Sequence, residues 1–145
     1  MDIKIKEIKF NSAEQLESIQ LRNRILREPL GLTFTKEELE NEHDQIHIAA
    51  IINNDLVGVL LFKKLDNKTL KMRQVAVDSH LQGNGIGKSL IQFAEQWAID
   101  NGYSDIELNA RATAFDFYMS LNYKPIGDEF LEVNIPHFKF VKTLF

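Results

Sequence analysis

Alternating glycines in the middle of the chain constrain its fold more than any other feature. Gly83, Gly85 and Gly87 follow a segment, Thr69 to Val77, with the apolar alternation of a strand, and they precede a helical pattern that continues to about Asp100. The free N–H groups and the dipole of a helix start attract anions. The sequence therefore predicts that this loop binds a phosphate or a pyrophosphate.

The spacing of the glycines separates the classes of phosphate-binding loop. The dinucleotide fingerprint requires Gly-x-Gly-x-x-Gly, whereas this chain has Gly-x-Gly-x-Gly. The mononucleotide P-loop ends as Gly87-Lys88-Ser89 does, but its first glycine would stand at position 82, which is Gln82. The run Gln82-Gly83-Asn84-Gly85-Ile86-Gly87 instead resembles Gln/Arg-x-x-Gly-x-Gly/Ala, the pyrophosphate-binding signature of the GNAT acyltransferase superfamily.

The resemblance to this superfamily continues on both sides of the loop. It covers residues 70 to 127, through the segments Met72-Arg73-Gln74-Val75-Ala76-Val77, Asn109-Ala110-Arg111-Ala112, Phe117-Tyr118 and Leu121-Asn122-Tyr123. The end of the chain is similar to a bacterial branch of small GNAT proteins of mostly unassigned substrate, through Phe130-Leu131-Glu132, Ile135-Pro136-His137 and Phe138-Lys139-Phe140. The first 65 residues resemble the superfamily only loosely. The resemblance implies an N-acetyltransferase that uses acetyl-CoA and a small-molecule or peptide amine as acceptor.

A slip in the alternation of the strand before the loop marks where the cofactor is expected. Apolar residues fall at Leu70 and Met72 and then at Val75 and Val77, which predicts a β-bulge. In the superfamily the bulged strand splays from its neighbour, and its backbone pairs with pantetheine. The resemblance implies that acetyl-CoA is bound by Val75, Ala76, Val77, Gln82, Gly83, Asn84, Gly85, Ile86, Gly87, Lys88, Asn109 and Tyr118.

Two positions of the loop carry less charge than in the commoner form of the signature. Gln82 stands in place of an arginine and Asn84 in place of a lysine. We therefore expect the pyrophosphate to depend on backbone N–H groups and on Lys88.

The resemblance also implies catalytic roles for two residues. The backbone N–H of Val75 is the expected oxyanion donor, and Tyr118 is expected near the sulfur of CoA. Tyr118 need only donate a hydrogen bond there, since its reference pKa of about 10 exceeds that of a thiol, about 8.5. Packing in the apolar core is the alternative explanation for both side chains.

The sequence contains no evident general base. Some relatives place a glutamate where this chain has Lys71, which leaves Glu132 and His137 as candidates. The alternatives are an exposed loop carboxylate and a hydrogen-bonded structural histidine. Arg111 could reach a phosphate or a carboxylate of the acceptor, or lie in solvent. Asn109 could bond the pantetheine arm or occupy the turn at a helix start.

Composition narrows the function further. The absence of cysteine excludes a cysteine nucleophile and a thiolate metal site, and a turn is expected between His43 and His47, so no metal site is predicted. A net charge of −4 argues against broad nucleic-acid binding. No apolar run approaches the roughly 20 residues that span a bilayer, and the start of the chain lacks the apolar core of a signal peptide. We therefore expect a cytoplasmic protein without membrane contact.

The order of the predicted elements indicates one α/β domain over residues 1–145, built as an α+β sandwich. Strands are expected near 3–10, 46–52, 56–62, 69–77, 105–109, 123–127 and 137–143, and helices near 12–26, 35–42, from the glycine loop to 100, and 112–121. The two early helices are expected to face the acceptor. The resemblance implies a mixed, mostly antiparallel central sheet with the bulged strand, flanked by about four helices, and late strands that pair in a homodimer.

Two functional classes remain open at this point. The first is an acetyltransferase that moves an acetyl group from acetyl-CoA to a primary amine by direct attack. The second is a non-catalytic acyl-CoA-binding regulatory module, which the lack of an evident base favours.

Overall fold

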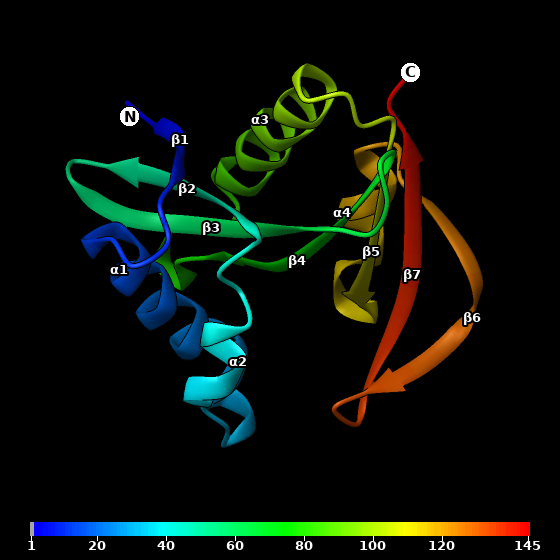
Figure 1. Cartoon of the computed structure of the whole chain (residues 1–145). Coiled ribbons are helices and arrows are strands. Elements are labelled where there is room, and N and C mark those ends of the chain that lie inside the picture. The colour runs from blue at the N-terminus through cyan, green and yellow to red at the C-terminus, as the bar shows by residue number, and fades with distance from the viewer. Residues whose placement is uncertain (1) are drawn as a thin grey trace.

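One mixed sheet organises residues 2–145, the part of the chain that this computed structural model describes (Figure 1). Its seven strands lie in the order β1-β2-β3-β4-β5-β7-β6. They are β1 (Lys4–Ile8), β2 (Ile46–Ile52), β3 (Asp55–Lys64), β4 (Thr69–Val77), β5 (Asp105–Arg111), β6 (Lys124–Glu132) and β7 (Ile135–Thr143). Every neighbouring pair is antiparallel except β4 and β5, so the predicted mixed, mostly antiparallel sheet is confirmed.

Helices cover both faces of this sheet, as in an α+β sandwich. They are α1 (Ala13–Arg22), α2 (Lys36–Glu40), α3 (Ile86–Asp100) and α4 (Phe115–Ser120), with the short helices η1 (Asn23–Arg27), η2 (Glu28–Leu30), η3 (Ser79–Leu81) and η4 (Ala112–Ala114). α3 and α4 pack on one face, and α1 with η1 on the other. Within the described residues, none of the helices is long and apolar enough to cross a membrane.

Strand β3 shows how the two faces share the core. Leu60 and Phe62 are fully buried in the cluster beneath α3, whereas Val59 and Leu61 are fully buried in the cluster beneath α1. Successive side chains of a strand point to opposite faces, so a strand covered on both faces is apolar at every position. Burial of each such side chain contributes about 1.5–3 kcal/mol. The continuous apolar run of β3 therefore reflects this double burial.

The two early helices begin at their predicted caps. Ser12 Oγ accepts the N–H of Gln15 at 3.1 Å, but the Gln15 side chain accepts the N–H of Asn11 rather than that of Ser12. Thr35 and Glu38 form the full capping box of α2. The predicted α-helix over 12–26 is in fact the α-helix α1 followed by the π-helical η1. Single π-helical turns are rare and often occur at functional sites.

A bulge in β4 opens the sheet, as the slipped alternation predicts. The register between β3 and β4 shifts after Val59, and Gln74 adopts a φ of +56°. The parallel pairing of β4 with β5 ends at Met72 and Leu108, although both strands continue. Figure 1 shows the result: β2, β3 and β4 run across the molecule, while β5 and β7 run at a steep angle to them. Residues 75–77 of β4 therefore have no strand partner on their β5 side.

Strands β5 and β6 are longer than predicted, and this changes the setting of two candidate residues. β5 continues to Arg111, so Asn109 lies within a strand rather than at the turn before a helix. β6 continues to Glu132, which ends the strand and does not lie in a loop. The polar segment 127–129, which suggests a loop, forms a bulge in β6 instead. The reason is β7, which pairs with both strands and keeps them extended.

Candidate active site

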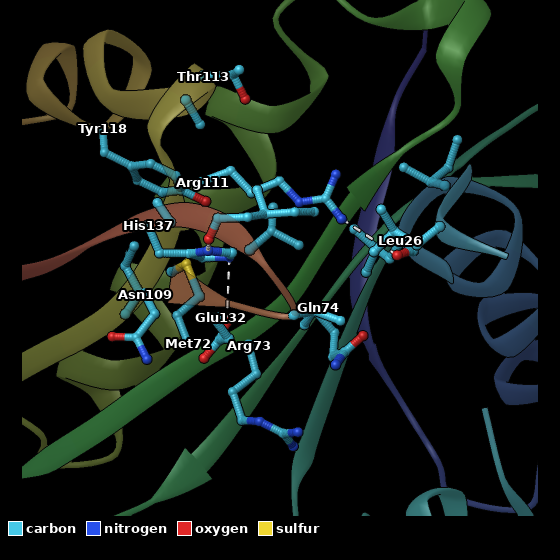
Figure 2. A pocket seen from close by; sticks show the side chains of 18 of the residues that line it. Leu26, Met72, Arg73, Gln74, Asn109, Arg111, Thr113, Tyr118, Glu132 and His137 are labelled. Carbon is cyan, nitrogen blue, oxygen red and sulfur yellow. Dashed lines mark hydrogen bonds and ion pairs between the residues drawn. The ribbon is translucent and has the colours of Figure 1, made fainter. Parts of the chain in front are cut away.

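A cavity of about 280 Å³ lies where β4 and β5 separate (Figure 2). Seven parts of the chain line it: η1, η2, the bulge of β4, the end of β5, η4, α4 and the β6–β7 hairpin. The polar side chains of its wall include Arg27, Arg73, Gln74, Asn109, Arg111, Tyr118, Glu132 and His137. The structure therefore brings five predicted site residues to one place, namely Val75, Asn109, Tyr118, Glu132 and His137.

The edge of β4 leads from this cavity to the glycine loop. Val75 lines the cavity, and Ala76 and Val77 continue towards the loop, which η3 precedes. Backbone N–H and C=O groups need hydrogen bonds. Because pairing with β5 stops at Met72, an extended ligand can pair with this edge as an added strand would. The side chain of Val75 packs on the main core, so core packing explains the side chain and the predicted role falls to its backbone.

The glycine loop has the backbone geometry of an anion site. Gly83 and Gly85 have φ angles of +87° and +79°, at which a residue with a side chain would be strained. Gly85 directly precedes α3, and the hydrogen bond from the N–H of Ser89 to the Gly85 carbonyl, at 3.0 Å, is the first of the helix. The N–H groups of residues 86–88 come before that bond and have no partner within the helix. Three adjacent donors therefore lie at the positive end of α3.

The side chains of the loop shape it more than they charge it. Gln82 Nε2 donates to the Val77 carbonyl at 3.1 Å, which ties the loop to the end of β4. Asn84 Nδ2 donates to the Leu81 carbonyl at 3.2 Å. Lys88 is exposed, and no carboxylate among residues 2–145 forms an ion pair with it. The charge available to a pyrophosphate at this loop is therefore that of Lys88 and the start of α3.

Tyr118 belongs to the core and to the cavity at once. Its ring packs on Tyr123 and Phe140, with ring centroids 5.8 and 5.7 Å apart, and only 6% of the residue is exposed. Burial raises the pKa of the Tyr118 hydroxyl above its ordinary value. Among residues 2–145 the hydroxyl has no hydrogen-bond partner, and the residue lines the cavity (Figure 2). The hydroxyl therefore keeps its proton and can donate it to a hydrogen bond with a ligand.

His137 and Glu132 form a pair across the β6–β7 hairpin. His137 Nδ1 lies 2.7 Å from the carbonyl oxygen of Ile135, and His137 Nε2 lies 3.3 Å from Glu132 Oε2. The carbonyl and the carboxylate both only accept, so either ring nitrogen can carry the proton of a neutral ring; with that proton on Nδ1, Nε2 is the nitrogen that can accept another. Only 6% of His137 is exposed, whereas Glu132 is about half exposed. The pair thus connects the buried cavity wall to its mouth.

Arg111 reaches the η1 side of the cavity. It ends β5 directly opposite His137 of β7, and its Nη2 donates to the Leu26 carbonyl of η1 at 3.4 Å. Figure 2 shows the Arg111 side chain extending across the cavity towards Leu26. No residue of the glycine loop lines this cavity. The guanidinium of Arg111 is therefore held near η1 and away from the predicted pyrophosphate site.

Sequence reasoning did not identify two polar residues of the bulge as site residues. Arg73 Nη1 donates to Gln45 Oε1 at 2.8 Å, and the buried Oε1 atom of Gln74 has no hydrogen-bond partner among residues 2–145. Both residues lie inside the slip between Met72 and Val75. A bulge turns residues away from the regular faces of a sheet, so the slip itself was the signal for them.

The two early helices differ in their relation to the site. The last residues of the first helical segment, Ile25 to Arg27, line the cavity. α2 instead lines a neighbouring hollow of about 650 Å³, which also contains Lys71 and His43. His47 is buried in β2, its Nε2 lies 3.0 Å from the Glu42 carbonyl, and burial lowers its pKa. No group of three metal-ligating side chains occurs among residues 2–145.

Comparison with known proteins decides the family. The model of the acetyltransferase (GNAT) domain matches residues 21–144. The chain belongs to the GNAT acetyltransferase family. YjcF, an uncharacterized N-acetyltransferase of Bacillus subtilis, is 32% identical over 107 residues, which are 73% of this chain and 74% of YjcF. The chain spans only 29% and 32% of the length of two longer curated relatives that it also matches.

Solved structures of GNAT proteins share the fold over the whole chain. A candidate N-acetyltransferase from Lactobacillus plantarum superposes with a TM-score of 0.89 at 20% identity and covers 100% of both chains. An aminoglycoside 6'-N-acetyltransferase in complex with coenzyme A superposes with a TM-score of 0.81 at 21% identity, covering 98% of this chain and 97% of that one. The predicted family and fold are thereby confirmed, and the acetyl-CoA-dependent activity and the roles of individual site residues stay predictions.

Proposed function

We propose that this GNAT protein transfers the acetyl group of acetyl-CoA to a primary amine by direct attack in the cavity between β4 and β5. One observation carries the proposal: Val75, Tyr118 and the His137–Glu132 pair meet in that cavity. Val75 lies on the strand that leads to the glycine loop. An oxyanion donor, a donor for the leaving group and a proton acceptor are the three groups that acetyl transfer needs.

Acetyl-CoA would lie along β4. Its pyrophosphate accepts from the N–H groups at the start of α3 and from Lys88, and its pantetheine arm pairs with residues 75–77 where β5 has turned away. Asn109 of β5 faces the same opening and can bond the arm from the other side. This path would bring the thioester to the cavity, because Val75 is the one residue of 75–77 that lines the cavity wall.

The reaction then needs no covalent enzyme intermediate. The amine nitrogen forms a bond to the carbonyl carbon, and the carbonyl oxygen takes the electron pair and accepts a hydrogen bond from the Val75 N–H. When the carbonyl re-forms, the carbon–sulfur bond breaks and Tyr118 donates a hydrogen bond to the departing thiolate. The proton of the amine passes to His137 Nε2, beside the Glu132 carboxylate.

A proton acceptor matters because most primary amines are protonated at neutral pH. With a reference pKa of about 10.4, only about one amine in 2,500 is neutral at pH 7, which corresponds to roughly 4.6 kcal/mol. The carboxylate of Glu132 stabilises the charge that His137 acquires when it removes this proton. The exposure of Glu132 at the mouth gives the proton a path to solvent.

The test is amine-dependent release of CoA thiol by the purified chain. Acetyl-CoA is mixed with a broad panel of amines, and His137→Gln and Glu132→Gln are compared with the unaltered chain. General base catalysis contributes about 10²–10⁴-fold, so we expect His137→Gln to lower kcat by an amount in that range and Glu132→Gln to lower it less. Binding of acetyl-CoA with no amine-dependent thiol release would contradict the proposal and favour the non-catalytic acyl-CoA-binding regulatory module.

A further inference from the structure

The charges on the cavity wall are unbalanced. Of its three arginines, Arg27 pairs with Glu38 at 3.2 Å, whereas Arg73 donates to the neutral amide of Gln45 and Arg111 donates to a backbone carbonyl. No carboxylate of residues 2–145 forms an ion pair with Arg73 or Arg111. A partly buried guanidinium group loses hydrogen bonds to water, and a carboxylate or phosphate replaces them best. The cavity therefore contains two cations that form no ion pair with a carboxylate of residues 2–145.

These two cations differ in how they can meet a ligand. Arg73 is anchored by Gln45, and in Figure 2 its side chain extends away from Arg111. Arg111 crosses the cavity, and its one hydrogen bond, at 3.4 Å, is long for an N–H···O contact. Most of the five N–H donors of a guanidinium thus remain for a ligand at Arg111. Arg73 adds positive potential at the opposite wall.

The proposed proton acceptor of the cavity lies next to Arg111. His137 is the cross-strand partner of Arg111, and side chains in such positions have Cβ atoms about 4.5–5.5 Å apart. His137 with Glu132 is the proposed acceptor of the amine proton. A molecule whose amine lies at His137 therefore has its neighbouring atoms within reach of the Arg111 guanidinium. The cavity of about 280 Å³ also limits that molecule to a small one.

We propose that the acceptor of this GNAT protein is a small amine that also carries a carboxylate, which Arg111 binds while the amine lies at the His137–Glu132 pair. This inference rests on the proposed acetyl transfer and adds the chemical class of the acceptor. The same charges disfavour polycationic acceptors, because Glu132 is the single carboxylate that lines the cavity among residues 2–145.

The experiment compares acceptors that differ only in the carboxylate. Small α-, β- and γ-amino acids are each assayed beside the matching carboxamide, which keeps the shape and removes the charge. We expect the best amino acid to exceed its amide in kcat/KM by about tenfold or more, as a charge-assisted hydrogen bond does. Arg111→Gln should remove this preference by lowering kcat/KM for the acid about 10- to 100-fold while changing that for the amide less than about threefold.

Two further variants make the result specific. Arg111→Lys keeps the charge without the planar fork, so it should retain part of the preference. Arg24→Gln removes an exposed arginine that pairs with Asp78 outside the cavity, and it should retain all of the preference. Thermal unfolding shows whether each variant is folded. If Arg111→Gln does not fold, competition by simple carboxylates against the acceptor on the unaltered chain replaces it, and absence of competition overturns the inference.

The outcomes separate this inference from the proposed function. Acetylation of amides or polyamines at least as fast as of amino acids would overturn the carboxylate site and leave acetyl transfer standing. Thiol release that no amine accelerates would overturn both. A preference for the acid that survives in Arg111→Gln would also overturn the assignment of the carboxylate to Arg111.

Discussion

Two neighbouring tyrosines allow the role of Tyr118 to be separated from its packing. Tyr118 and Tyr123 are both buried, and their rings meet edge to face with centroids 5.8 Å apart. The Tyr123 hydroxyl donates to Glu95 Oε2 at 2.9 Å, while the Tyr118 hydroxyl has no partner among residues 2–145 and faces the cavity. Replacement of either by Phe removes one oxygen atom from the same aromatic cluster.

The two variants should therefore have opposite effects. A hydrogen bond to a charged group contributes about 1.5–3 kcal/mol, so Tyr118→Phe should lower kcat about 10- to 150-fold if its hydroxyl supports the departing thiolate. The KM for acetyl-CoA should change little, and the free energy of unfolding should stay within about 0.5 kcal/mol. Tyr123→Phe breaks the bond to Glu95 and should cost about 1–3 kcal/mol of stability with kcat unchanged.

Steady-state kinetics and urea unfolding of the two variants measure these four quantities. The comparison is internally controlled, since both changes remove a hydroxyl from one cluster. If Tyr118→Phe keeps full kcat, or if any loss of activity comes with a loss of stability as large as that of Tyr123→Phe, Tyr118 acts through packing alone and the reasoning is refuted.

Three other predictions concern the loop, a buried histidine and a buried ion pair. Gly85→Ala should lower stability by about 1 kcal/mol and should also lower the affinity for acetyl-CoA measured by calorimetry. Gly102 has a similar positive φ but lies far from the loop, so Gly102→Ala should lower stability alone. Burial lowers the pKa of His47, so the unfolded chain binds more protons than the folded chain. The free energy of unfolding should therefore fall as the pH drops below about 6.5, by at most 1.36 kcal/mol per pH unit. His47→Gln should remove this slope in urea titrations. The fully buried Arg22 guanidinium lies 2.8 Å from Glu42 Oε1, so Glu42→Gln leaves it without its counter-charge. This change should lower the free energy of unfolding in urea by about 3–5 kcal/mol, and a second change, Arg22→Met, should restore part of the loss.

Each of these three has an outcome that contradicts it. Equal loss of acetyl-CoA affinity in the Gly85 and Gly102 variants would show that the loop does not hold the ligand. An unchanged pH slope in His47→Gln would assign the titration to another group. A mild effect of Glu42→Gln would show that the Arg22 guanidinium is compensated elsewhere.

The sequence predicted most of the fold because its local signals agree with the tertiary structure. The hairpin of β2 and β3, the bulge of β4 and the long helix α3 each combine a clear apolar period with turn or capping residues. The resemblance to the superfamily implied that the sheet opens at this bulge. The family signature then supplied the expected guest of the glycine loop, which spacing alone limits only to a phosphate or pyrophosphate.

The errors came from segments whose conformation depends on distant partners. Residues 127–129 are polar enough to suggest a loop, yet pairing with β7 keeps β6 extended to Glu132. The π-helical η1 has no sequence signal, because its residues suit an α-helix equally well. The contact of Arg111 with Leu26 joins residues far apart in the chain, so no local pattern could indicate which side of the cavity Arg111 faces.

A crystal structure with acetyl-CoA tests the central claim most directly. The account predicts the pyrophosphate at the N–H groups of residues 86–88, pantetheine along residues 75–77, the thioester oxygen about 2.7–3.2 Å from the Val75 nitrogen, and the sulfur beside the Tyr118 hydroxyl. A pyrophosphate bound elsewhere, or a thioester outside the cavity between β4 and β5, would contradict it.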